Sequence, residues 1–122
     1  MNRNLTSFAL AVIAFASFAA SGRDTSAEGI PAARLHQNAP NPFNLSTTIP
    51  YELGSETAAT LSIYSLEGRR IAVLDRGSRP AGRHEVRWDG RDAGGSLVPS
   101  GIYFYRLQTG THSETRKLMF FH

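Results

Sequence analysis

Two carboxylates in a glycine-rich stretch are the first residues whose types and spacing suggest chemistry. Asp89 and Asp92 lie in the run Asp-Gly-Arg-Asp, which is followed closely by two more glycines. Clustered carboxylate oxygens are the ligands that Ca²⁺ prefers. Only two carboxylates are present, however, Arg91 separates them, and the spacing of an EF-hand loop is missing. A turn explains the stretch better, because Asp accepts local backbone hydrogen bonds and Gly adopts positive φ. Asp89 and Asp92 are therefore weak metal-ligand candidates, and no metal is assigned.

Histidine, aspartate and serine are all present, but their arrangement does not predict a hydrolase. His84 and Asp89 with a nearby serine would supply the side-chain types of a catalytic triad. The sequence lacks the Gly-x-Ser-x-Gly turn that exposes a nucleophilic serine. His84 alternates in step with Val86 and Trp88, which indicates a packed or hydrogen-bonded histidine on a strand face. No catalytic residue is assigned, and the chain is predicted not to be an enzyme.

No cofactor is assigned either. The glycines at 90, 94 and 95 do not precede a helical pattern, so they do not form a phosphate-binding loop. The four histidines are widely scattered, without the paired spacing typical of zinc ligands. Tyr64, Tyr103 and Tyr105 would suit an exposed aromatic strip for a glycan, but aromatic residues in the strands of a small sandwich belong mostly to the core.

The elements that must position these residues centre on Glu85 to Leu107. Both ends of this stretch are rich in β-branched and aromatic residues, including Trp88 and the run Tyr103–Tyr105. Its middle consists mainly of Asp, Gly, Ser and Pro, an order that predicts strand, long turn and strand. We therefore expect a β-hairpin here. Its aromatic side chains are expected to form the nucleus of the hydrophobic core, since each buries about 150–250 Å².

Period-two alternation of apolar and polar residues predicts strands along the rest of the chain. Pro50 favours an edge position or a bulge, and Phe43 is expected to pack against the end of the fold. Turn-forming residues separate the strands at short intervals, so about seven strands in an antiparallel β-sandwich are predicted. Outside the 85–107 stretch, the expected strands cover 34–38, 47–53, 59–64, 70–74 and 113–121, and residues 77–82 are expected to be a loop.

The last expected strand ends in Leu118-Met119-Phe120-Phe121, which is apolar on both faces. An unpaired strand of this composition would promote aggregation. We therefore expect it to be buried between neighbouring strands or docked on a partner.

The N-terminus predicts a secretory signal peptide over residues 1–21. Arg3 precedes an apolar run from Leu5 to Ala20, and small residues follow. The run is shorter than the roughly 20 apolar residues of a membrane-spanning helix. Cleavage after Ala19, Ser21 or Ala27 would satisfy the small-residue rule. Residues 22–33 are predicted to be a flexible linker, and residues 34–122 the sandwich.

The composition limits the classes of partner. The net charge is +3, and the chain contains one lysine, Lys117, and no cysteine. Disulfides and thiolate metal sites are therefore excluded. A nucleic-acid-binding protein usually clusters its basic residues, whereas adjacent basic pairs occur here only at Arg69-Arg70 and Arg116-Lys117. The high isoelectric point is attributed to arginine-rich composition, and no nucleic-acid partner is predicted.

The sequence resembles the C-terminal sorting domain of type IX secretion substrates and, almost equally, the immunoglobulin-like module of the flagellar hook-capping protein. The resemblance covers residues 34–122. It is carried by an ordered set of segments: Asn38–Asn44, Ser46–Ile49, Leu61–Tyr64 with Gly68-Arg69, Ala81-Gly82 with Trp88–Gly90, Ser100–Tyr105 and Thr115–Leu118.

This resemblance implies a seven-stranded immunoglobulin-like sandwich in an exported bacterial protein. It also implies an address tag that the outer-membrane translocon reads and that a surface peptidase usually removes. Sorting tags normally follow a cargo domain, and here no cargo separates the signal from the tag. A stand-alone module, a truncated product and a structural domain are therefore all compatible with the sequence.

The leading hypothesis is a non-enzymatic sorting or docking domain, exported to the periplasm, the cell surface or the medium. Its protein partner would be an outer-membrane translocon or an envelope assembly. The expected docking element is the last strand, whose exposed edge would bind by strand addition. A structural assembly subunit and a small carbohydrate- or calcium-binding module are the alternatives, and the oligomeric state stays open. The predicted docking residues are Thr115, Arg116, Lys117, Leu118, Met119, Phe120 and Phe121.

Overall fold

The computed structural model of the protein describes residues 32–110 and 112–122. The predicted signal peptide, and all of the predicted linker except its last two residues, lie outside the described residues. Within the described part the chain forms seven strands, and none of it is a helix long and apolar enough to cross a membrane. The strands are β1 (Ala33–Leu35), β2 (Thr47–Leu53), β3 (Thr57–Tyr64), β4 (Arg70–Arg79), β5 (Gly82–Trp88), β6 (Gly101–Thr109) and β7 (His112–Phe120).

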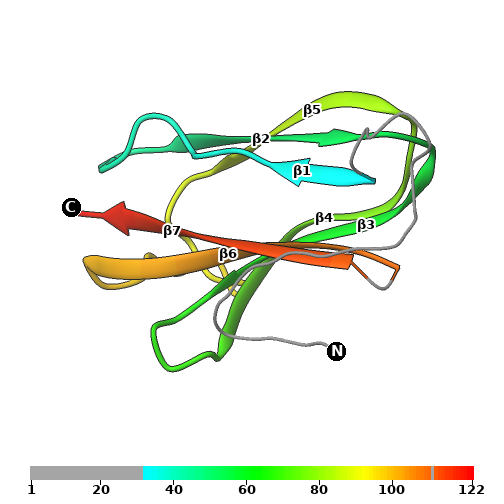
Figure 1. The fold of residues 1–122 in the computed structure, drawn as a ribbon. Coiled ribbons are helices and arrows are strands. Elements are labelled where there is room, and N and C mark those ends of the chain that lie inside the picture. The colour runs from blue at the N-terminus through cyan, green and yellow to red at the C-terminus, as the bar shows by residue number, and fades with distance from the viewer. Residues whose placement is uncertain (1–31, 111) are drawn as a thin grey trace.

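The strands form two antiparallel sheets that stack face to face (Figure 1). The smaller sheet has the order β1-β2-β5 and the larger has the order β4-β3-β6-β7. Alternate residues of each strand point into the space between the sheets, as the pleat requires. In β2, for example, Ile49, Tyr51 and Leu53 are buried, whereas the residues between them are partly exposed. The predicted antiparallel β-sandwich is confirmed.

An aromatic cluster fills one end of the core. The ring of Trp88 lies 5.8 Å from that of Tyr103 and 5.9 Å from that of Phe120, measured between centroids. Phe43 stacks on Phe120 at 4.8 Å and meets Trp88 edge to face at 5.7 Å. Trp88 comes from the smaller sheet, and Tyr103 and Phe120 from the larger one, so the cluster joins the two layers. The predicted burial of Trp88, Phe43, Tyr103 and Tyr105 is confirmed.

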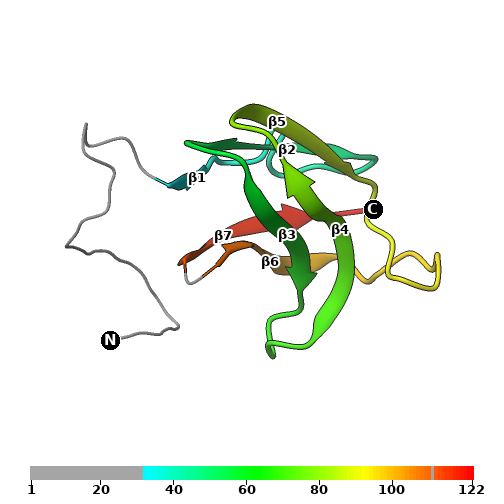
Figure 2. The ribbon, with the colours of Figure 1, turned by 90° about the vertical axis from the view of Figure 1, so that its right-hand side faces the viewer.

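The expected hairpin between Glu85 and Leu107 is wrong. β5 pairs with β2, whereas β6 pairs with β3 and β7, so the two strands belong to different sheets. The intervening segment crosses from one layer to the other and projects beyond the sandwich (Figure 2). Aromatic side chains on two strands are buried equally well side by side or face to face. The pattern therefore indicates burial but does not specify the partner strand.

Pro50 lies in the central strand of the smaller sheet, not at an edge or a bulge. Its carbonyl accepts a hydrogen bond from the backbone N–H of His36 at 3.0 Å. Proline has no N–H to donate in return. The carbonyl of His36 instead accepts a hydrogen bond from the Tyr105 hydroxyl at 2.6 Å. β1 therefore ends at Leu35, three residues earlier than predicted.

The predicted loop over residues 77–82 is also wrong, because β4 continues to Arg79 and β5 begins at Gly82. A bulge interrupts the alternation: Leu61 of β3 is opposite Asp75, but the next residue is opposite Val73. The glycine, serine and arginine that follow have loop-like side chains. Their backbone nevertheless pairs with β3 from Thr57 onward, because ladder hydrogen bonds do not depend on side-chain type.

Candidate functional site

The predicted docking strand divides its residues between two environments. β7 is the edge strand of the larger sheet and does not lie between two strands. Three of its predicted docking residues lie on the core side of the sheet: Arg116, Leu118 and Phe120. Three lie on the outer face: Thr115, Lys117 and Met119. Phe121 follows the end of the strand and is 46% exposed.

The free edge that strand addition would need is closed along the C-terminal half of β7. Phe43 forms an isolated parallel bridge with Phe120. The N–H of Phe43 donates to the Met119 carbonyl at 3.1 Å, and the N–H of Phe121 donates to the Phe43 carbonyl at 3.0 Å. The N–H of Met119 donates to Oδ1 of Asn41 at 2.9 Å. A strand added here would have to displace these bonds, so the expected exposed edge is wrong for this part of β7.

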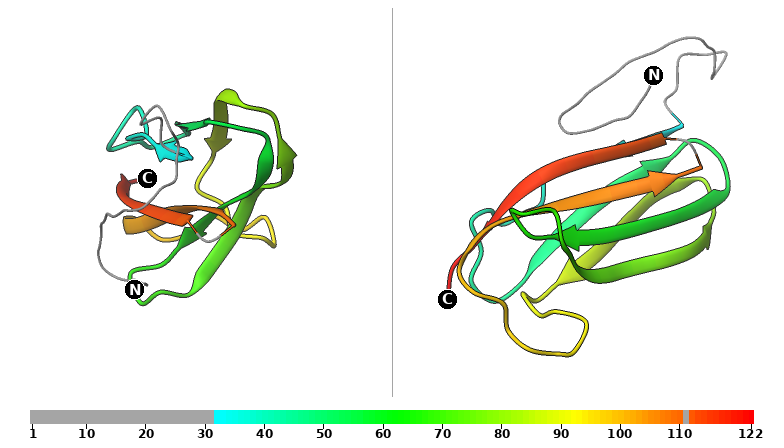
Figure 3. Two further views of the ribbon diagram at one scale, coloured as in Figure 1. Left: turned by 45° about the vertical axis from the view of Figure 1, so that its right-hand side comes forward. Right: turned by 90° about the horizontal axis from the view of Figure 1, so that it is seen from below.

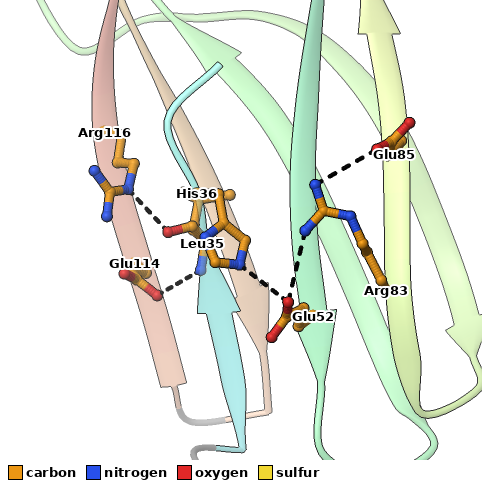
Figure 4. Close-up of polar contacts among 7 residues, drawn as sticks. All are labelled: Leu35, His36, Glu52, Arg83, Glu85, Glu114 and Arg116. Atoms are coloured by element: carbon orange, nitrogen blue, oxygen red, sulfur yellow. Dashed lines mark hydrogen bonds and ion pairs between the residues drawn. The ribbon is translucent and has the colours of Figure 1, made fainter. Parts of the chain in front are cut away.

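The first half of β7 closes a different edge, that of β1. The backbone N–H of Leu35 donates to Oε1 of Glu114, and Nε of Arg116 donates to the Leu35 carbonyl, both at 2.9 Å (Figure 4). One acidic and one basic side chain thus satisfy both backbone groups of an edge residue. Hydrogen bonds to charged groups are among the stronger ones in proteins. Arg116 is therefore held in a structural contact.

A second charged group lies across the outer surface of the smaller sheet. Arg83 lies 3.6 Å from Glu52 and 3.5 Å from Glu85, measured between nitrogen and oxygen atoms, and His36 lies 3.4 Å from Glu52 (Figure 4). These side chains are partly exposed, and exposed ion pairs contribute little to stability. Their effect is to neutralise this face locally.

Tyr105 ties the segment after β1 to the larger sheet. Its buried hydroxyl donates to the His36 carbonyl at 2.6 Å and accepts from the Asn38 N–H at 2.9 Å. The side-chain amide of Asn38 donates in turn to Oγ1 of Thr47 at 2.9 Å. Burial raises the pKa of Tyr105 to about 12. The hydroxyl therefore stays protonated and can donate at neutral pH.

A third polar group joins the two sheets at the other end of the sandwich. The Tyr51 hydroxyl donates to Oδ2 of Asp75 at 3.0 Å. Arg79 donates to the same carboxylate from Nε at 3.2 Å and from its terminal nitrogen. The hydrogen bond from Arg79 holds the pKa of Asp75 below its usual value. Burial, followed by the bond to Asp75, raises the pKa of Tyr51 to about 12.

The two metal-ligand candidates lie in a loop organised by backbone contacts. Oδ1 of Asp92 accepts the N–H groups of Gly94 and Ser96, both at 3.0 Å. Asp89 lies 3.8 Å from Arg91, whose carbonyl accepts the indole N–H of Trp88 at 2.9 Å. This is the geometry of a carboxylate-centred turn. Among residues 32–110 and 112–122, no group of three or more His, Cys, Asp or Glu side chains gathers where it could hold a metal ion.

The remaining chemical candidates are not brought together. His84 stacks on Tyr51 at 5.1 Å and contacts the Pro80 carbonyl at 2.8 Å. Extended backbone separates His84 from Asp89 by about 16 Å, at roughly 3.3 Å per residue. Tyr103 and Tyr105 point into the core, whereas Tyr64 lies on the outer face of the larger sheet beneath Arg106. The three tyrosines therefore do not form one strip.

Sequence reasoning missed the structural contacts of Glu114, Arg116 and Asp75. Glu114 and Arg116 have polar neighbours, like ordinary solvent-facing strand residues, and Asp75 follows the predicted end of its strand. The available signal was phase: Glu114 and Arg116 are in step with Leu118 and Phe120, so a strand that buries the latter must turn the former inward as well.

Two stacked antiparallel sheets with a shared aromatic core define an immunoglobulin-like β-sandwich. The chain belongs to the FlgD Ig-like domain family, whose sequence model matches residues 44–113, more than half of the chain. This family is a structural, non-catalytic one. The resemblance to the hook-capping module is thereby confirmed.

Among the solved structures that align with this chain, PorU shows the same fold. Dimeric latent PorU from Porphyromonas gingivalis aligns with a TM-score of 0.61 and 23% identity over 75% of this chain. FlgD from P. aeruginosa aligns with a TM-score of 0.49 and 24% identity over 61% of this chain. PorZ, a surface component of the type IX secretion system of P. gingivalis, aligns with a TM-score of 0.48 and 19% identity over 72% of this chain. The matches span 10% of PorU, 57% of FlgD and 11% of PorZ. A comparison with curated proteins finds no match.

Proposed function

We propose that this protein is an exported docking module that a type IX-like secretion machinery recognises as a sorting domain. Its immunoglobulin-like family and its ordered sorting-domain motifs support the proposal. The partner is a protein of the envelope, such as the outer-membrane translocon. Export to the periplasm, the cell surface or the medium follows from the same proposal.

The observation that carries the proposal is the division of β7. Its inward side chains are used in the fold, because Leu118 and Phe120 are fully buried and Arg116 holds β1. Its outward side chains and the exposed Phe121 remain accessible. Recognition therefore uses side chains on the outer face of β7. It does not use a strand added to the C-terminal half of β7, because backbone and side-chain bonds close the edge there.

A reporter experiment tests the sorting role. Residues 32–122 are fused behind a signal peptide and a reporter enzyme in a host that has the type IX machinery. The fusion is expected at the cell surface or in the medium, and the reporter alone in the periplasm. If the fusion also remains periplasmic while the folded module is detected, the sorting proposal is wrong.

Paired variants test the docking face. Thr115→Glu with Lys117→Glu changes the outer face of β7 and is expected to retain the fusion in the periplasm. Thr48→Glu with Arg87→Glu introduces the same change of charge on the smaller sheet, where these residues are opposite each other. This control is expected to reach the surface. Equal export of both variants would contradict docking through β7.

A structural assembly subunit is the second candidate, because the family match is to the Ig-like domain of FlgD itself. Such a subunit should associate with itself or with an envelope scaffold. Sedimentation velocity measures this directly: oligomers that form with increasing concentration are expected. A monomer at every concentration, with no envelope protein recovered by cross-linking, excludes this candidate.

A further inference from the structure

Four cations from three strands lie on one face of the larger sheet. Residues that are opposite each other in paired strands share a face, and the register defines three successive rows across this sheet. Arg76 lies in the row of Thr60, Arg106 in the row of Ser62, and Arg70 and Lys117 in the row of Tyr64. Figure 3, right panel, shows these four strands side by side from below.

The same face contains a groove of about 360 Å³ that follows β3. Small side chains form its floor: Ala58, Thr60 and Ser62. Longer side chains from β4 and β6 form its walls: Arg70, Arg76, Arg106 and Gln108. The Arg106 guanidinium lies 4.7 Å above the Tyr64 ring, a contact that holds a cation at the groove before any ligand arrives.

The charge on this face is uncompensated within the described part of the chain. None of the three rows contains an aspartate or a glutamate. The outer face of the smaller sheet differs, because Arg83 there lies near both Glu52 and Glu85. A larger groove beside the 89–95 loop also mixes arginines with Asp89 and Asp92. The groove along β3 is therefore the one with a single sign of charge.

The spacing of the cations identifies the kind of ligand. Successive rows of a sheet are separated by two residues, or about 6.8 Å. Arg76, Arg106 and Arg70 occupy three successive rows on alternate walls of the groove. An extended peptide with an acidic residue at every second position presents carboxylates at the same interval. We propose that this groove binds an extended acidic segment of a partner protein.

This proposal does not rest on the sorting role, because it concerns the groove along β3 and any acidic partner segment. Its test uses the full chain and two fluorescent probe peptides of identical composition. One repeats Glu-Ser five times, and the other has five glutamates followed by five serines. Fluorescence polarisation should show tighter binding of the alternating peptide. Affinity should fall as the salt concentration rises, because exposed charges are screened.

Three variants locate the binding. Arg70→Gln, Arg76→Gln and Arg106→Gln together should weaken binding of the alternating peptide by about tenfold, from the loss of three exposed ion pairs. Arg34→Gln, Arg83→Gln and Arg87→Gln remove the same charge from the smaller sheet and should change affinity by less than about twofold, since charges beyond the Debye length are screened. Replacing the three groove arginines by lysine should preserve most of the affinity. Circular dichroism and melting temperature establish that each variant is folded.

Several outcomes would overturn the proposal. Equal loss of affinity in the two triple-glutamine variants would mean that net charge, not the groove, attracts the peptide. Equal binding of the two probe peptides would contradict the extended, alternating ligand. Dextran sulfate serves as a third probe. If it binds the groove in a salt-dependent manner and the peptides do not, the occupant is an anionic polysaccharide and not a protein segment.

Discussion

Replacing Tyr105 by phenylalanine tests whether one hydroxyl holds the segment after β1 to the larger sheet. The hydroxyl donates to the His36 carbonyl and accepts from the Asn38 N–H. The ring of Tyr105 has no exposed surface, and Asn38 is 2% exposed. Phenylalanine keeps the ring and its packing. The substitution therefore isolates the two hydrogen bonds, including the one that compensates for the missing N–H of Pro50.

The magnitude follows from the groups left behind. A buried backbone donor or acceptor without a partner costs about 1–3 kcal/mol. The Asn38 N–H is buried and the His36 carbonyl is partly buried, so Tyr105→Phe should destabilise the fold by about 2–4 kcal/mol. This is a large part of the roughly 5–15 kcal/mol that holds a typical domain together.

Tyr103→Phe is the matched control. Its hydroxyl makes one hydrogen bond, to the Pro99 carbonyl at 2.6 Å, and Pro99 lies in an exposed loop. Water can replace that bond, so the cost should be about 0.5–1.5 kcal/mol. The fluorescence of Trp88, the only tryptophan, reports unfolding in urea. With a slope of about 1–1.5 kcal/mol per molar urea, the midpoint for Tyr105→Phe should fall by about 1.3–4 M. Equal midpoints for the two variants, with unchanged slopes, would refute the reasoning.

Three further changes have defined outcomes. Trp88→Ala should cost about 3–5 kcal/mol, measured as a lower melting temperature, and an unchanged value would contradict its place in the aromatic cluster. Gly90→Ala should destabilise the fold, because Gly90 has φ of +78° and an added Cβ would lie 2.8 Å from Cε1 of Phe120. A neutral effect in urea unfolding would contradict that close approach. The pKa of Tyr51 is about 12 in the folded state and about 10 when unfolded, so the folded state holds the proton more tightly. Its contribution to stability is complete below pH 10 and is lost as the pH rises toward 12. The urea midpoint of Tyr51→Phe should therefore fall less steeply across that range than that of the wild type, and parallel curves would contradict this.

Residue alternation was sufficient to predict the fold class and most of the core. Trp88, Tyr103 and Tyr105 are in phase with other apolar residues of their strands, and all three are buried. Phe43 follows two prolines in a loop and still packs into the core, as expected. These predictions succeed because burial depends on local phase, which a single strand already contains.

Strand pairing could not be predicted in the same way, because it depends on segments far apart in the chain. β5 and β6 are adjacent in sequence but belong to different sheets. The cations of the groove along β3 come from β4 and β6, and only Arg70 among them belongs to an adjacent basic run in the sequence. Arg116-Lys117 is such a run, yet its two side chains lie on opposite faces of β7, and Arg116 bonds to β1. Neighbours in sequence are thus poor guides to a charged face built from several strands.

The way in which the edges of the sandwich are closed determines where a partner can bind. Glu114 and Arg116 hydrogen-bond to the backbone N–H and carbonyl of Leu35 at the edge of β1. The segment containing Phe43 bonds to the backbone at the end of β7. On the opposite side, the N–H of Ala93 donates to the Ile71 carbonyl of β4 at 3.1 Å. Each contact occupies backbone groups that would otherwise pair with a foreign strand. A partner therefore meets side chains on the sheet faces. Among the described residues, the outer face of the larger sheet has an excess of positive charge in each of the three successive rows that contain Thr60, Ser62 and Tyr64. Specificity in such a surface depends on which strands bring their arginines into successive rows, and the bulge in β4 sets that register by shifting Arg76 relative to Arg70.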